Sequence, residues 1–145
     1  MAAYRNILVA VDGSDESDAI LNKALQVAEN NKAQISVVLV FEPLLGHYSF
    51  ELKMSDFEKV QQEHQARVAD EIQRRLNVLS PPIPVDRLHL RRGRPAAEIK
   101  KLTAELNIDL LVIGSHGHNP VRAVLGSTAN AVLHGIECDV LTIRV

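Results

Sequence analysis

The sequence has little of the residues that mark several classes of protein. Among its 145 residues there is one cysteine and no tryptophan, and aromatic residues make up 3%. The single cysteine, Cys138, has no second cysteine with which to form a disulfide inside the chain. No apolar run approaches the roughly 18 residues that a membrane-spanning helix needs. The opening segment MAAYRNILVAV is too short and too strand-like for a signal peptide. We therefore expect a cytoplasmic protein with no membrane segment.

The sequence also lacks an excess of charge of one sign. It has 16 lysine and arginine residues and 18 aspartate and glutamate residues, which gives a formal net charge of −2. Proteins that bind nucleic acids draw affinity from clustered basic residues that neutralise phosphates, so this balance argues against a nucleic acid partner. Apolar residues make up 46% of the chain, which is usual for a folded globular protein. The length predicts one domain over residues 1–145.

Five segments have the pattern of β-strands. Residues 6–11, 35–41 and 109–113 are continuous apolar runs, which are typical of strands covered on both faces. Residues 85–91 alternate leucine with arginine and histidine, which predicts a half-covered strand at the edge of a sheet. Residues 140–145, VLTIRV, close the chain as a fifth predicted strand.

Four segments between these strands have the spacing of amphipathic helices. The first covers residues 17–30, the third begins at Pro95, and the fourth ends near His134. The second begins with a capping box, Ser55-x-x-Glu58, and is expected to run to about residue 79, because two prolines follow. The apolar side predicted for this second helix contains Phe57, Val60, His64, Val68, Ile72, Leu76 and Leu79.

Strands that alternate with helices predict an α/β fold with right-handed crossovers. We expect a single-domain open five-stranded parallel sheet in the order 3-2-1-4-5, with helices on both faces. In this order the chain reverses direction between strand 1 and strand 4, and ligands bind outside the carboxyl ends of the strands at such a point. Two loops would meet there, namely Asp12-Gly13-Ser14 and the glycine-rich residues 114–128.

The glycine-rich segment, GSHGHNPVRAVLGST, holds three of the seven glycines. Gly114 and Gly117 can adopt positive φ and let a ligand approach their amides. Gly126, followed by Ser127 and Thr128, would open the last helix, where unpaired amides attract anions.

These groups suit a nucleotide, with Asp12 placed for ribose hydroxyls and the main chain near Val40 for a purine edge. The alternative is that the glycines only shape turns and that Asp12 caps a helix, because short glycine motifs have many false positives.

Neither familiar phosphate loop is present. The chain contains no G-x-x-x-x-G-K-[ST] motif, and its glycine-rich segment follows the fourth predicted strand rather than the first. The charge of a bound phosphate would then be met by backbone amides, by Arg122 and His116, and by a divalent cation.

Four stretches carry a resemblance to a known family over essentially the whole chain. They are NILVAVDGSDES, ALQVA, GRPAAEI and the closing DLLVIGSHGHNPVRAVLGSTANAVLHGIECDVLTIRV, and with them the sequence resembles the universal stress proteins. In that family the motif G-x2-G-x9-G-[ST] marks the members that bind ATP. The resemblance implies a Rossmann-like fold of the adenine nucleotide alpha hydrolase type.

The resemblance also implies a role for individual residues. Asp12 would lie at the ribose, and the Val40 backbone would face adenine. The phosphates would be held by Gly114, Gly117, Gly126, Ser127 and Thr128, and the base and sugar pocket would be lined by Ala10, Val11 and Ile113.

One feature departs from the family motif. Eight residues, HNPVRAVL, separate Gly117 from Gly126, where the motif has nine. One missing residue would rotate a helical turn by about 100° and move Arg122 relative to the phosphates. AMP or ADP would then replace ATP, or binding would be weak.

Three functions remain open at this point. The first is an ATP-binding universal stress protein with a regulatory or protective role towards an unidentified protein partner. The second is a slow ATP hydrolase or nucleotide-transferring enzyme that uses His116 and a divalent metal ion. The third is an interaction module that binds no nucleotide. The apolar strand at residues 140–145 needs a partner at its edge, and the resemblance implies a homodimer formed through it.

Overall fold

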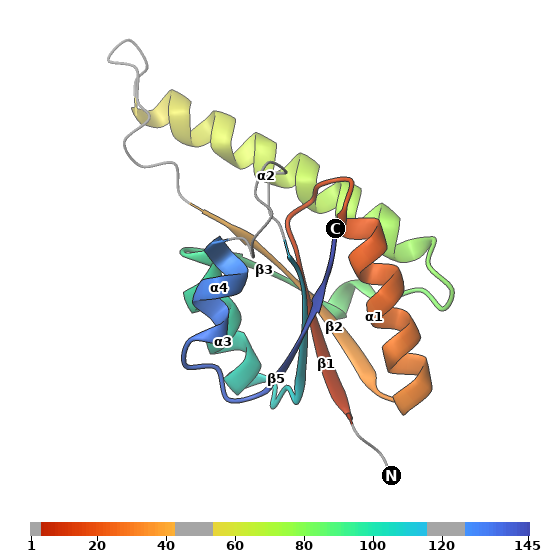
Figure 1. The fold of residues 1–145 in the computed structure, drawn as a ribbon. Coiled ribbons are helices and arrows are strands. Elements are labelled where there is room, and N and C mark those ends of the chain that lie inside the picture. The colour runs from red at the N-terminus through yellow and green to blue at the C-terminus, as the bar shows by residue number, and fades with distance from the viewer. Residues whose placement is uncertain (1–3, 43–53, 116–126) are drawn as a thin grey trace.

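The computed structural model describes residues 4–42, 54–115 and 127–145. In these residues a parallel sheet of five strands has the order β3-β2-β1-β4-β5, as predicted (Figure 1). The strands are β1 (Asn6–Val11), β2 (Gln34–Phe41), β3 (Leu88–Arg92), β4 (Leu110–Gly114) and β5 (Asp139–Ile143). The helices are α1 (Ser17–Asn31), α2 (Met54–Asn77), α3 (Pro95–Glu105) and α4 (Ser127–Leu133).

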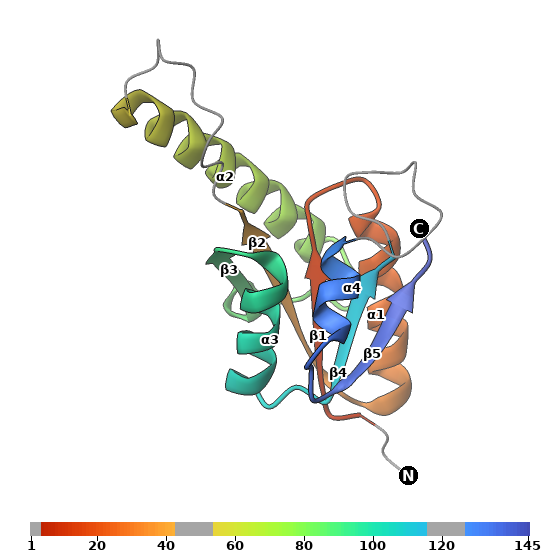
Figure 2. The ribbon, with the colours of Figure 1, turned by 60° about the vertical axis from the view of Figure 1, so that its left-hand side comes forward.

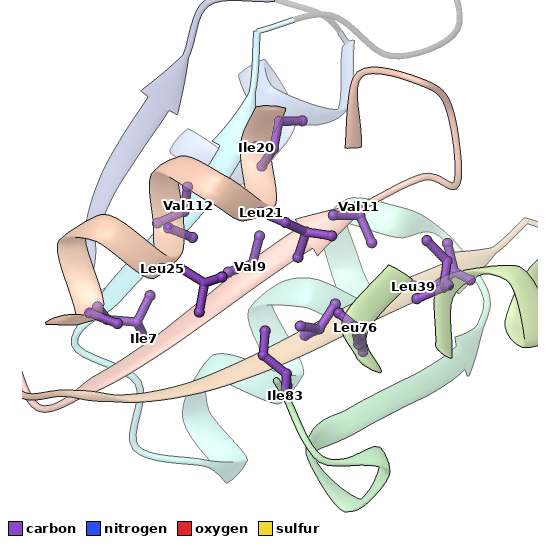
Figure 3. Close-up of a cluster of buried hydrophobic side chains, with 14 of the residues drawn as sticks. Ile7, Val9, Val11, Ile20, Leu21, Leu25, Leu39, Leu76, Ile83 and Val112 are labelled. Atoms are coloured by element: carbon purple, nitrogen blue, oxygen red, sulfur yellow. The ribbon is translucent and has the colours of Figure 1, made fainter. Parts of the chain in front are cut away.

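The helices form a layer on each side of the sheet, so the predicted fold class is confirmed. Helices α1 and α2 cover one face and α3 and α4 cover the other (Figure 2). Successive strand residues point to opposite faces, and in β1 Ile7 and Val9 pack under α1 while Leu8 joins the cluster beneath α3 and α4. Figure 3 shows the first cluster, with side chains of α1 and α2 packed on the central strands.

Helix α2 differs from its prediction in extent and in packing. It ends at Asn77, two residues before the expected end, and it includes Ser55, so that serine is not the residue that caps it. Ile72 and Leu76 are buried in the core, but Val60 is 59% exposed and His64 is also exposed. The first half of α2 extends beyond the edge of the sheet (Figures 1 and 2), so Val60 has no strand to pack on.

Hydrogen bonds explain why β4 starts one residue later than predicted. The carboxylate of Asp109 accepts hydrogen bonds from the amides of Arg5 at 2.8 Å and Asn6 at 3.0 Å. The Asp109 amide donates to the Asn6 carbonyl at 3.0 Å. Asp109 therefore ties the start of β1 to the start of β4 instead of continuing the strand.

The predicted edge strand is confirmed in its place in the sheet but is shorter. Residues Val85–Arg87 form a turn of 3-10 helix and β3 begins at Leu88. Leu88 packs against the core, whereas Leu90 on the same side of the strand is 43% exposed. The edge is thus covered along only part of its length.

Candidate ligand-binding site

A cavity of about 620 Å³ lies at the carboxyl ends of β1, β2 and β4. This is the point at which the chain order reverses, because β1 lies between β2 and β4 and its two neighbours are reached by crossovers in opposite directions. Of the residues that the sequence singles out, those that line this cavity are Ala10, Val11, Asp12, Val40, Ile113, Gly114, Ser127 and Thr128. The others, His116, Gly117, Arg122 and Gly126, lie outside the described residues.

Asp12 shapes the turn that follows β1. Its Oδ1 atom accepts a hydrogen bond from the amide of Ser14 at 2.9 Å and one from the hydroxyl of Ser17 at 3.4 Å. Bonds of this kind between an aspartate and the amide two residues on are typical of tight turns. Asp12 therefore shapes this turn but does not cap α1, whose N-cap residue is Glu16, and Asp12 also lines the cavity.

The loop that contains Asp12 is held against α2. Gly13 has φ of 82°, in the left-handed region, and a β-carbon there would lie 2.9 Å from Cγ1 of Val68. The guanidinium of Arg75 donates to the Ser14 carbonyl at 2.8 Å and to the Glu71 carboxylate at 2.8 Å. Helix α2 thereby fixes the position of the loop relative to the sheet.

Gly114 has a different role from the one predicted. Its φ is not positive, and it is the last residue of β4. A β-carbon on Gly114 would lie 2.7 Å from Cδ1 of Ile20 in α1. The absence of a side chain at Gly114 therefore leaves room for the Ile20 side chain of α1, and the prediction of a left-handed conformation here is wrong.

The main chain at the end of β2 offers a hydrogen-bond acceptor to the cavity. β1 ends at Val11, which is paired with Leu39, so β2 continues for two residues beyond its neighbour. In a parallel sheet the main-chain groups of successive residues point to opposite neighbouring strands. The Phe41 carbonyl accepts a hydrogen bond from the Gly93 amide, on the β3 side, at 3.0 Å. The Val40 carbonyl therefore points to the β1 side, beyond the end of β1, where the cavity lies.

Ser127 and Thr128 form the β4 side of the cavity. They are the first two residues of α4. Ser127 is exposed and Thr128 is half-buried, and both residues line the cavity.

Sequence analysis missed the contribution of α2 to the cavity. Gln61, His64, Gln65 and Val68 line it, at positions i, i+3, i+4 and i+7 of one helical face. The signal was present, because two glutamines interrupt the side of α2 that was predicted to be apolar. Nothing in the local pattern shows, however, that this side passes over the end of the sheet.

Three titratable groups with a shifted pKa, those of Tyr4, His89 and Cys138, lie away from the cavity. The hydrogen bond from the Tyr4 hydroxyl to Asp139 raises the pKa of Tyr4. Burial lowers the pKa of His89, and the nearby Arg91 and Arg87 lower it further. Burial raises the pKa of the Cys138 thiol, so the thiol rather than the reactive thiolate is favoured. No group of three or more histidine, cysteine or acidic side chains among the described residues could hold a metal ion. No helix in the described part of the chain is long and apolar enough to cross a membrane.

A parallel sheet in this order, with a cavity at its carboxyl edge, defines a Rossmann-like fold. The chain belongs to the universal stress protein family, whose sequence model matches residues 3–144. Universal stress protein A homolog 1 of Coxiella burnetii is 33% identical over 140 residues, which cover 97% of this chain and 96% of that protein.

Solved structures share this fold. Universal stress protein UspA from Lactobacillus plantarum superposes on this chain with a TM-score of 0.82 at 26% sequence identity. The superposition covers 99% of this chain and 100% of that chain. A universal stress protein in complex with cAMP superposes with a TM-score of 0.65 at 23% identity and covers 98% of each chain.

Proposed function

We propose that this universal stress protein binds an adenine nucleotide at the carboxyl ends of β1, β2 and β4. The observation that carries the proposal is that one cavity is lined by Val40, Asp12, Ser127 and Thr128. A main-chain carbonyl, a carboxylate and hydroxyl groups suit a base, a ribose and phosphates respectively. The volume of about 620 Å³ lies within the usual range for small-molecule sites.

The order of the strands gives the ligand a direction. Strands β2, β1 and β4 are adjacent in that sequence across the sheet, so Val40, Asp12 and the α4 residues follow one another along the crevice. We therefore place the base at β2, the ribose at β1 and the phosphates at the start of α4. In this arrangement the phosphates would meet Gly117, Gly126, Arg122 and His116, as the family motif implies.

ATP is the nucleotide that the motif favours, with ADP or AMP as alternatives. A structure of the same fold contains cAMP, which shows that an adenine nucleotide can be accommodated in that protein and is consistent with the present proposal. Mg²⁺ usually binds through phosphates and one or two carboxylates. We propose that it would enter with the phosphates of ATP, with Asp12 as a carboxylate lining the same cavity.

We further propose that the protein acts as a homodimer whose partner surface depends on nucleotide occupancy. β5 is an edge strand, and among the described strands it pairs with β4 alone. A free edge of this kind can pair with a second copy of itself. We propose binding and regulation as the function, and slow hydrolysis that uses His116 and a divalent metal ion is the alternative.

Isothermal titration calorimetry of the nucleotide-free protein with ATP tests this function. Saturable binding with one ATP for each chain supports it. The absence of binding at millimolar ATP, with or without Mg²⁺, contradicts it.

A further inference from the structure

Gln65 is a buried polar side chain without a hydrogen-bond partner among the described residues. It is 8% exposed and lies on the face of α2 that lines the cavity. Other buried or half-buried polar side chains face the protein: the Thr103 hydroxyl donates to the Lys100 carbonyl at 2.6 Å, the Ser17 hydroxyl donates to Asp12, and Ser14 Oγ and Glu16 Oε2 are shut off from solvent. The polar atoms of the Gln65 carboxamide are not among those shut off from solvent. The carboxamide is therefore open to the cavity that Gln65 lines and is available to a ligand.

Gln65 shares the cavity wall with the end of β2. Helix α2 packs on the sheet face that includes Leu39 of β2, and the cavity lining continues from this residue to Val40 and Phe41. The other polar side chains that line the cavity beside α2 and β2 are less buried than Gln65: Gln61 is half-buried, and His64 and Glu42 are exposed. Gln65 is therefore the polar side chain of α2 best placed to meet a ligand that also reaches the Val40 carbonyl.

A carboxamide carries a donor and an acceptor side by side, and it matches a ligand edge with an acceptor beside a donor. Adenine presents that edge with N7 and the N6 amino group, and glutamine is a common bidentate partner of these two atoms. The N6 amino group has a second hydrogen, which the Val40 carbonyl can accept. Guanine has the O6 acceptor in place of this amino group, so its edge would leave the Val40 carbonyl without a donor.

We infer that Gln65 reads the N6 and N7 edge of the bound adenine and is the residue of α2 that determines base specificity. This inference rests on the proposed function, because it assumes a nucleotide with its base at β2. Gln65 would donate through Nε2 to N7 and accept at Oε1 from N6. The neighbouring Gln61 and His64 line the same face and would close the cavity over the base without reading it.

The test compares two nucleotides that differ at one atom. In 7-deaza-ATP a C–H group replaces N7, which removes the proposed acceptor and leaves the rest of the ligand unchanged. The binding of ATP, 7-deaza-ATP and GTP is measured by calorimetry for the wild-type chain, for Gln65→Met and for Gln62→Met. Methionine keeps the volume of glutamine but has no strong donor or acceptor, and Gln62 is an exposed residue of α2 that does not line the cavity, which makes it a matched control.

We expect the wild-type chain to bind ATP about tenfold more tightly than 7-deaza-ATP, in line with one good base contact. Gln65→Met should lose about tenfold in ATP affinity and bind both nucleotides within a factor of about two. Gln62→Met should behave as the wild type. Equal binding of ATP and 7-deaza-ATP by the wild-type chain overturns the inference. A Gln65→Met chain that still prefers ATP to 7-deaza-ATP as strongly as the wild type also overturns it. Both results leave nucleotide binding intact. A wild-type chain that binds none of the nucleotides overturns the proposed function, and the role of Gln65 with it.

Discussion

Gly13, in the loop between β1 and α1, lies directly against Val68 of α2. A β-carbon on Gly13 would lie 2.9 Å from Cγ1 of Val68. Both residues line the cavity, one beside Asp12 and the other one helical turn after Gln65. The contact therefore joins the two sides of the crevice. It makes the position of α2 and the position of the Asp12 loop depend on each other.

Substitution of Gly13 by alanine should destabilise the protein more than its backbone conformation alone requires. A non-glycine residue in the left-handed region costs about 1 to 2 kcal/mol, and forcing a methyl group into a packed contact costs about 1 to 3 kcal/mol more. Gly135 provides a matched control, because it has the same φ of 82° and a β-carbon there would have no neighbour within 4 Å. Chemical denaturation should therefore give a larger loss of unfolding free energy for Gly13→Ala than for Gly135→Ala. Equal losses would show that the Val68 contact has no energetic weight.

Gly114→Ala should be destabilising through a single atom of α1. The new β-carbon would lie 2.7 Å from Cδ1 of Ile20, and overpacking of this kind costs about 1 to 3 kcal/mol. Ile20→Val removes that Cδ1 atom at a cost of about 0.5 to 1.5 kcal/mol. In a double-mutant cycle measured by denaturation, the cost of Gly114→Ala should fall by about 1 kcal/mol or more in the Ile20→Val background. Additive effects would contradict the packing role assigned to Gly114.

The fold was predictable because its strongest signals are local and continuous. β1, β2 and β4 are unbroken apolar runs, which are typical of strands covered on both faces. The helices between them allow only a few ways to connect the strands. The predictions that were wrong concern the position of a segment relative to other segments. Residues on the first half of α2 have helical apolar spacing, but the sequence does not reveal that this half extends past the sheet and leaves Val60 exposed.

The candidate site was predictable in part for a related reason. Residues at the ends of β1 and β4 could be predicted, because a known strand order fixes which loops meet. Gln65 could not, because its place over the crevice depends on how far along the sheet α2 packs. Gly114 shows a different limit, since a glycine that looks suited to a ligand also leaves room for the Ile20 side chain.

Asp12→Asn should weaken nucleotide binding while the fold is kept. Asparagine retains an Oδ1 acceptor for the Ser14 amide, so the turn after β1 should survive. The loss of the negative charge removes charge-assisted hydrogen bonds to ribose and any carboxylate ligand for Mg²⁺, and we expect a loss of about tenfold in ATP affinity. Asp15→Asn is the control, because Asp15 is exposed on the same loop and does not line the cavity. Equal affinities of the two variants in calorimetry would remove Asp12 from the site.

Thr142→Pro should dissociate the proposed dimer without unfolding the chain. The Ile143 carbonyl accepts a hydrogen bond from the Ser115 amide at 2.8 Å on the β4 side, so the main chain of Thr142 points to the outer edge. A proline at an outward-facing edge position removes only the donor that a second copy would use. Ile143→Pro is the control and should lose about 3 kcal/mol, because it breaks the pairing with β4.

Light scattering coupled to size-exclusion chromatography checks the dimer. The wild-type chain should have the mass of two chains and Thr142→Pro the mass of one, with cooperative unfolding retained. A Thr142→Pro protein that remains dimeric would place the interface elsewhere, and a monomeric wild-type chain would remove the dimer from the account.

The most direct test of the central claim is to denature the purified protein and identify the small molecules that it releases. The account predicts that chromatography and mass spectrometry find an adenine nucleotide in an amount approaching one for each chain, and that Asp12→Asn and Gln65→Met each release less. Protein that releases no adenine nucleotide, and that also takes up none when it is refolded with millimolar MgATP, would contradict the account.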